Sequence, residues 1–105
     1  MKYFAVITTC GNEEEAVSIV DQLLNAKLIA CANWWPVGSA YWWEGECEHT
    51  KEFMVFMKTT EEKLDLVRSA VRTAHSYRNP EVIQIRISGG SKEYLDWVGE
   101  SVNKR

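Results

Sequence analysis

The chain has 105 residues, of which 46% are hydrophobic, so it can bury one hydrophobic core and leaves no room for a second domain. Its 15 acidic and 12 basic residues are scattered and give a net charge of -3, which argues against nucleic acid or an anionic membrane as a partner. The longest strictly apolar stretches, such as residues 3–7, are far shorter than the roughly twenty residues that cross a bilayer.

The first predicted elements are a buried strand and an amphipathic helix. Residues 3–9 are aromatic and β-branched without polar alternation, which indicates a strand that is covered on both faces. Asn12 is a predicted N-cap, and Glu15 occupies the reciprocal capping-box position. Apolar residues then recur at helical spacing, at Ala16, Ile19, Val20, Leu23 and Leu24.

A long hairpin is predicted for the middle of the chain. Residues 28–35 and 40–43 have the composition of a strand, and residues 36–38 (Pro-Val-Gly) interrupt it. Because proline cannot donate a ladder hydrogen bond, we expect a kink or a bulge there. A Glu-Gly-Glu turn follows at residues 44–46, and residues 53–57 form the return strand.

The last part of the chain predicts a helix, a strand and a short helix. Thr59 and Glu62 form a second capping-box pattern before a helix with apolar residues at positions 64, 67, 71 and 74. Residues 82–87 alternate as a half-buried strand does, with three isoleucines on one face. Ser91 follows two glycines and can cap a final helix.

The order β-α-β-β-α-β with a terminal helix predicts an α+β fold of the ferredoxin-like type, with one antiparallel sheet and two helices on a single face. We expect residues 1–105 to form one domain of this type. The other face of the sheet then starts bare, although its strands are apolar and the chain has five tryptophans. Large exposed apolar patches mark interaction surfaces, so we expect self-association through the sheet.

With these elements placed, four stretches of the sequence resemble the CutA divalent-cation tolerance family. They are residues 8–13 (TTCGNE), 28–33 (LIACAN), 41–46 (YWWEGE), and 75–81 (HSYRNPE) followed by 94–97 (YLDW). The resemblance covers nearly the whole chain in the correct order. It implies a homotrimer similar to the PII signalling trimers, linked to tolerance of copper and other divalent cations.

The resemblance also implies a metal site at Cys10 and His75, which match the positions to which copper binding is attributed in some members. Thiolate and imidazole suit copper, so Cu(II) or another divalent cation is the expected ligand, with no organic cofactor. Alternatively, Cys10 only fills space at a strand end and His75 only interacts with the carbonyl end of its helix. Cys47 and His49 share one face of a strand and could also chelate a soft metal, although the family pattern does not support this pair.

Five further residues match family positions that line a cleft between subunits: Lys58, Tyr77, Glu81, Tyr94 and Trp97. Polar groups that converge on an apolar pocket could bind a small molecule. The alternative is that Tyr94 and Trp97 anchor a short helix while Lys58 and Glu81 are solvated.

Catalytic motifs are missing from the sequence, which has no Ser-His-Asp pattern, H-E-x-x-H, Walker loop or nucleotide-binding glycine motif, so we expect no enzyme activity. Glutamates at 13–15 disfavour an anion at the preceding loop. An RNA-binding sheet would need a basic surface and an RNP1-like string, and the sequence has neither.

Two functions remain: a trimeric copper-binding tolerance protein, and a PII-like trimer whose cleft receives a small molecule or a partner segment. Because the sequence shows no export signal and its three cysteines are an odd number, we expect the cytoplasm.

Overall fold

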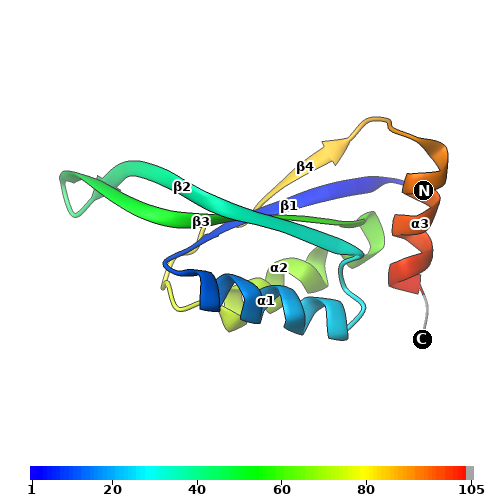
Figure 1. The fold of residues 1–105 in the computed structure, drawn as a ribbon, viewed down its shortest axis with the longest axis horizontal. Coiled ribbons are helices and arrows are strands. Elements are labelled where there is room, and N and C mark those ends of the chain that lie inside the picture. The colour runs from blue at the N-terminus through cyan, green and yellow to red at the C-terminus, as the bar shows by residue number, and fades with distance from the viewer. Residues whose placement is uncertain (104–105) are drawn as a thin grey trace.

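The computed structural model describes residues 1–103 as one four-stranded sheet with helices packed on it (Figure 1). The elements in chain order are β1 (Tyr3–Cys10), α1 (Glu13–Asn25), β2 (Cys31–Trp43), β3 (Glu46–Thr60), a 3₁₀ turn (Glu61–Lys63), α2 (Leu64–Ala74), β4 (Ile83–Ile87) and α3 (Lys92–Asn103). The strands lie in the order β2-β3-β1-β4, and every neighbouring pair is antiparallel. The predicted α+β plan with its C-terminal helix is confirmed.

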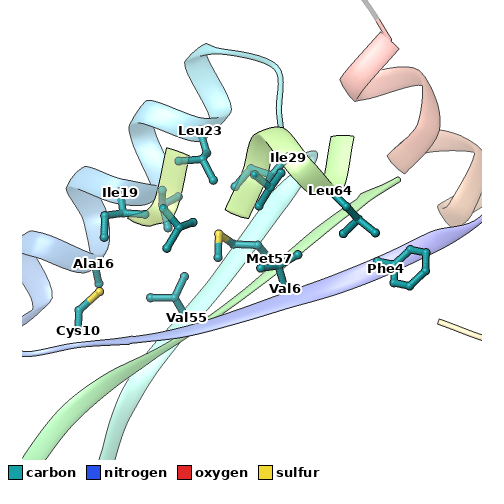
Figure 2. Packing of buried hydrophobic residues seen from close by; sticks show 13 residues of the cluster. Phe4, Val6, Cys10, Ala16, Ile19, Leu23, Ile29, Val55, Met57 and Leu64 are labelled. Carbon is teal, nitrogen blue, oxygen red and sulfur yellow. The ribbon is translucent and has the colours of Figure 1, made fainter. Parts of the chain in front are cut away.

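Helices α1 and α2 cover one face of the sheet, which we call the helical face. Phe4, Val6 and Cys10 alternate along β1 and belong to the buried cluster, together with Val55 and Met57 of β3. Figure 2 shows Val55 and Met57 pointing from the sheet towards α1, which carries Ile19 and Leu23, while Phe4 lies at the other end of the layer near Leu64. Each fully buried aliphatic side chain of this kind contributes about 2–3 kcal/mol, so this layer supplies most of the stability of the subunit.

The opposite face of the sheet, which we call the open face, carries the alternate residues of each strand. Ala5 of β1 pairs with Ile85 of β4 and with Lys58 of β3, so these three residues share that face. Helix α3 covers one end of it, where Val98 and Val102 are buried and a Cβ at Gly99 would lie 3.5 Å from the Tyr3 hydroxyl. The rest is bare.

The isoleucines of β4 differ from the sequence-based expectation of a half-buried strand. Ile83 and Ile85 are each 48% exposed, because no element within residues 1–103 lies over them. Their partners on β1 are Ile7 and Ala5, and Trp35 on β2 is 43% exposed on the same face. The side of β4 that the pattern marked as buried is therefore an apolar surface of the isolated subunit.

The β2–β3 hairpin extends beyond the rest of the molecule (Figure 1). β1 pairs with β3 only from Phe53 to Thr60, so residues 37–52 form a two-stranded ribbon. This ribbon raises the radius of gyration to 14.3 Å, compared with about 13 Å for a compact chain of this length. Its end exposes large aromatic side chains, with Trp42 77% and Trp43 55% accessible. No helix within residues 1–103 is long and apolar enough to span a bilayer.

The predicted interruption of β2 at residues 36–38 was wrong. β2 and β3 pair residue for residue from Cys31 opposite Lys58 to Trp43 opposite Glu46, with Pro36 opposite Phe53 and no bulge. β2 is the edge strand of the sheet, where proline is tolerated because only one neighbour requires donors. The hairpin closes through residues 44–45, both with positive φ (50° and 83°), which is the conformation of a type I′ turn.

Of the two predicted capping boxes, the one before α2 was wrong, and only the Asn12 half of the one before α1 was confirmed. Thr59 does not cap α2, because its hydroxyl donates to the Leu28 carbonyl at 2.6 Å and the helix follows a 3₁₀ turn. Asn12 does cap α1, since its Oδ1 accepts from the Glu15 amide at 2.8 Å. The Glu15 carboxylate, however, binds Ser76 in the α2–β4 loop.

Candidate functional site

The fold brings Cys10 and His75 together from opposite ends of the sequence. Cys10 is the last residue of β1 and His75 is the C-cap of α2, and Sγ lies 3.9 Å from Nε2. Both residues are buried, with Cys10 fully inaccessible and His75 9% exposed. Figure 2 shows the Cys10 side chain on the helical side of the sheet, near Ala16. We call Cys10, Glu15, Glu52, His75, Ser76 and Tyr77 the Cys10–His75 cluster.

Both nitrogens of the His75 ring have partners that define its tautomer. Nε2 lies 2.7 Å from the Thr9 carbonyl oxygen, which can only accept, so Nε2 carries the proton. Nδ1 accepts from the Tyr77 backbone N–H at 3.1 Å, so the second nitrogen holds the lone pair. The alternative that His75 interacts with the carbonyl end of its own helix is therefore wrong: the carbonyl it contacts belongs to β1.

Glu15 connects α1 to the loop after α2 beside this histidine. Its carboxylate accepts from the Ser76 amide at 2.6 Å and from the Ser76 hydroxyl at 3.0 Å. Oε2 also lies 3.7 Å from His75 Nδ1. Burial alone would raise the pKa of Glu15, but the bonds from Ser76 and the proximity of His75 lower it below its usual value. Glu15 is thus an anion placed against the imidazole.

The thiol of Cys10 is held in its protonated form. Burial, with the negative charges of Glu15 and Glu52, raises the pKa of Cys10 to about 12. Glu52 is itself only 6% exposed and accepts a hydrogen bond from the Tyr77 hydroxyl at 2.8 Å. Burial and this contact also raise the pKa of Tyr77. The cluster therefore combines a neutral thiol, an imidazole whose two nitrogens both have hydrogen-bond partners, and two carboxylates that accept hydrogen bonds from neighbours.

Cys10 and His75 would give a metal ion two ligands, and the structure offers no third His, Cys, Asp or Glu ligand beside them within residues 1–103. Among residues 1–103, no three His, Cys, Asp or Glu side chains gather so as to hold a metal ion. The other predicted thiol–imidazole pair lies far out on the hairpin, where Cys47 pairs with Trp42 and His49 with Ala40. Both are exposed, and they share a face of β3 because they are two residues apart.

A second cluster forms on the open face around Lys58. Its Nζ donates to Asn33 Oδ1 at 3.2 Å and to Cys31 Sγ at 3.7 Å, and it lies 5.6 Å from the centre of the Tyr94 ring. The Tyr94 hydroxyl lies 3.3 Å from Cys31 Sγ, and the Tyr94 ring packs 5.5 Å from that of Trp97. Burial alone would lower the pKa of Lys58, but Tyr94 and Cys31 raise it, so the amine is a cation. We call these residues the Lys58 cluster.

The five predicted cleft residues divide between the two clusters. Lys58 of β3 meets Tyr94 of α3 on the open face, and Trp97 of α3 packs against the Tyr94 ring. Tyr77 instead packs against the His75 ring, with centroids 4.8 Å apart, and Glu81 is exposed in the loop before β4. One subunit therefore does not join all five residues in a single pocket.

Sequence reasoning missed Cys31, Asn33, Glu15 and Glu52 as members of these clusters. Cys31 and Asn33 were within the resembling stretches, and their i, i+2 spacing places them on one face of a strand. Their link to Lys58 depends on the β2–β3 register, in which Cys31 is opposite Lys58. Glu15 had been assigned to a local cap, and no local signal indicated a contact with residue 76.

Comparison with known proteins gives a consistent result. A family model described as "CutA1 divalent ion tolerance protein" matches residues 4–101. The chain is 43% identical over 97 residues to the "Divalent-cation tolerance protein CutA" of Archaeoglobus fulgidus, covering 92% of this chain and 95% of that protein. Identity to the protein of the same name from Thermotoga maritima is 39% over 97 residues, covering 92% and 96%.

Solved structures show the same similarity in three dimensions. The "Periplasmic divalent cation tolerance protein CutA" from Archaeoglobus fulgidus has a TM-score of 0.94 at 42% identity, covering 96% of this chain and 99% of that chain. CutA1 from Oryza sativa has a TM-score of 0.95 at 34% identity, covering 100% and 97%. The similarity therefore extends over the sheet and the helices on both of its faces.

Proposed function

Because the chain belongs to the CutA1 divalent ion tolerance family, we propose that it acts in metal tolerance as a non-enzymatic homotrimer that binds Cu(II) or a related divalent cation through Cys10 and His75. The observation that carries this proposal is the 3.9 Å separation of Cys10 Sγ and His75 Nε2. Metal–sulfur and metal–nitrogen bonds of about 2.3 and 2.0 Å place two ligands of one ion about 3.5–4 Å apart. The pair thus has the spacing that a shared cation needs.

Glu15 supports this reading as the group that would orient the histidine. For Nε2 to bind a cation, its proton must move to Nδ1, and its bond to the Thr9 carbonyl and the bond that Nδ1 accepts from the Tyr77 N–H must both break. Nδ1–H would then face the Glu15 carboxylate, which lies 3.7 Å away. A carboxylate behind a ligating imidazole fixes the tautomer and raises the basicity of the ligand.

The protonated thiol gives the proposal a definite pH dependence. A thiol must lose its proton to bind a metal, and the pKa of Cys10 is raised to about 12. Each cation bound therefore releases one thiol proton at any pH near neutrality. The apparent dissociation constant should fall about tenfold for each unit of pH between 6 and 8.

The open face supports the trimer. Ile83 and Ile85 of β4 and Trp35 of β2, all exposed on this face, form an apolar surface that a monomer would leave in water. Subunits that cover it would also bring the Lys58 cluster of one chain towards its neighbour.

We further propose a cytoplasmic location, because Cys10, Cys31 and Cys47 are all free and such thiols persist in a reducing compartment. The relative from Archaeoglobus fulgidus that is named periplasmic marks the alternative.

The deciding experiment is a Cu(II) titration by calorimetry on purified, reduced, anaerobic protein of known oligomeric mass. We expect saturable binding to a trimer, an absorption band from thiolate-to-copper charge transfer, and loss of both in Cys10→Ser and His75→Ala. The double variant Cys47→Ser with His49→Ala is the matched control, because it removes the same two side-chain types from the exposed hairpin.

Circular dichroism must show that the two buried substitutions retain the fold. Binding that is insensitive to Cys10→Ser, or that disappears only in the hairpin variant, would contradict the proposed ligands. A monomeric wild-type protein would contradict the trimer.

A second candidate function is supported by the Lys58 cluster. A cation held between Asn33 and Cys31 and set over the Tyr94 ring can bind an anionic group of a small molecule or a partner segment at a subunit boundary, as in a PII-like signalling trimer. Substitution of Lys58 by Met with Trp97 by Ala would abolish this function and leave copper binding intact, whereas Cys10→Ser would do the reverse.

A further inference from the structure

A groove beside α2 is lined mainly by polar side chains that neither cluster uses. One wall is the face of α2 that carries Asp65, Arg68, Ser69, Arg72 and Thr73, and the other is formed by residues 78–80 and Val82 of the α2–β4 loop. Its volume is about 730 Å³, within the range of about 300–1,000 Å³ of small-molecule sites. None of these residues belongs to the Cys10–His75 cluster or the Lys58 cluster.

Positive charge is concentrated in this groove although the protein as a whole is acidic. Arg68, Arg72 and Arg78 are three of the five arginines in a sequence whose net charge is -3. Asp65 is the one carboxylate in the lining, and it pairs with Arg68. Arg68 also donates to Gln84 at 2.6 Å, so its guanidinium is already held in place.

The other two arginines have no such partners. Among the hydrogen bonds and ion pairs of residues 1–103, none involves the side chain of Arg72 or Arg78. Arg72 is four residues after Arg68 and therefore lies on the same face of the helix, one turn further on. The loop after His75 brings Arg78 into the lining of the same groove. Two unpaired guanidinium groups thus border one small space.

The hydrogen-bonding groups between these charges favour an oxyanion. Ser69 and Thr73 contribute hydroxyls and Asn79 contributes an amide, all of which can donate to phosphate oxygens. Guanidinium groups bind phosphate through two parallel hydrogen bonds, and two of them match two adjacent phosphates. A nucleic acid would need a longer row of cations than this bounded groove provides.

We propose that the groove between α2 and residues 78–82 binds a small diphosphate, with Arg72 and Arg78 as its main anchors and Arg68 as a third, preorganised cation. The pyrophosphate group is the recognised chemistry. It could come from inorganic pyrophosphate or from a nucleoside diphosphate, and the two can be separated by titration.

The test is a calorimetric titration of the full chain with sodium pyrophosphate in EDTA-containing, metal-free buffer. The absence of divalent cations makes the result independent of copper binding. We expect saturable binding that weakens about tenfold in Arg72→Gln and about tenfold in Arg78→Gln, as expected when a charge-assisted hydrogen bond is lost. Arg86→Gln is the matched control, since Arg86 is an exposed arginine on β4 outside the groove, and it should bind like the wild type.

Parallel titrations with ADP and citrate identify the ligand. Tighter binding of ADP than of pyrophosphate would show that the groove also contacts a nucleoside, and equal or weaker binding would assign the site to the diphosphate alone. The proposal is overturned if pyrophosphate does not saturate the wild type at millimolar concentration, if Arg86→Gln weakens binding as much as Arg72→Gln, or if citrate binds as tightly as pyrophosphate.

Discussion

The two faces of the sheet both carry apolar residues, but one face is buried within the chain and the other is largely exposed. Ile19, under the helical face, has no exposed surface, whereas Ile85, on the open face, is 48% exposed. Helices α1 and α2 complete the first face within one chain, and α3 completes only one end of the second. The comparison teaches that an apolar pattern in a strand identifies a surface that must be covered and does not say which chain covers it.

Loss of assembly is the largest effect that this comparison predicts. Ile85→Asp places a charge on the open face, and we expect the proposed trimer of 12.1 kDa subunits to fall to monomers. Light scattering coupled to gel filtration measures the mass. Leu66→Asp is the control, because Leu66 is 56% exposed on α2, away from the open face, and should leave the mass unchanged. Retention of the wild-type mass by Ile85→Asp would show that the open face is not the interface.

Two cysteines provide a second comparison, because Cys10 is buried and Cys47 is exposed to solvent. Burial beside two carboxylates raises the pKa of Cys10 to about 12, while Cys47 is exposed on the hairpin. The thiolate is the reacting species, so at pH 8 Cys10 should react with a disulfide reagent at least about tenfold more slowly than an ordinary thiol with a pKa of about 8.5, even after the greater nucleophilicity of a more basic thiolate is included. Reagent uptake by Cys10→Ser and Cys47→Ser assigns the phases. A fast phase that is lost in Cys10→Ser would mean that β1 opens in the native state.

The sequence predicted the elements of the helical face well, because both helices bury a stripe with one clear period. Ala16, Ile19, Val20 and Leu23 all lie in the core as their spacing indicated. It was less informative about β4, where alternation correctly indicated two different faces and could not show that the apolar one lacks a cover in the subunit. The uninterrupted pairing of β2 past Pro36 depended on its edge position, which is a property of the sheet order.

The candidate sites could be predicted only in part, for a related reason. The resemblance identified Cys10 and His75, and the fold places them 3.9 Å apart. It did not reveal that Glu15 approaches the same imidazole, because a glutamate at the N3 position of a helix has a local explanation in the capping box. Contacts between residues 60 or more positions apart, such as Glu15 with Ser76, follow from the packing of α1 beside the α2–β4 loop.

A pair of matched truncations should separate the two faces by stability. Ile19→Ala removes a fully buried side chain from the core and should cost about 3–4 kcal/mol at any protein concentration. Ile85→Ala should cost less than about 1 kcal/mol in dilute solution and more as concentration rises, because the exposed part of this side chain would be buried by the proposed association. Urea denaturation at two protein concentrations measures both. Equal, concentration-independent losses would mean that the open face is covered within the subunit.

The smallest predicted effect concerns the Glu15 carboxylate, which links α1 to the α2–β4 loop through Ser76. The pKa of Glu15 is lowered in the folded state by Ser76 and His75, so its charged form favours folding. Because the folded pKa is the lower one, this stabilisation is complete above the unfolded value of about 4.3 and is lost as pH falls through the folded pKa. Glu15→Gln should therefore cost about 1 kcal/mol at pH 7 and almost nothing at pH 3.

Glu14→Gln is the matched control for this last substitution, since Glu14 is exposed in the same helical turn and has no side-chain partner within residues 1–103. It should cost only a few tenths of a kcal/mol, the value of a first-turn carboxylate near the helix dipole. Urea denaturation at pH 7 and pH 3 compares the two variants. Since the Glu15–Ser76 contact lies within one chain, its effect should not vary with protein concentration, in contrast to that of Ile85→Ala. A dependence on concentration would mean that this loop, too, is shaped by a neighbouring subunit.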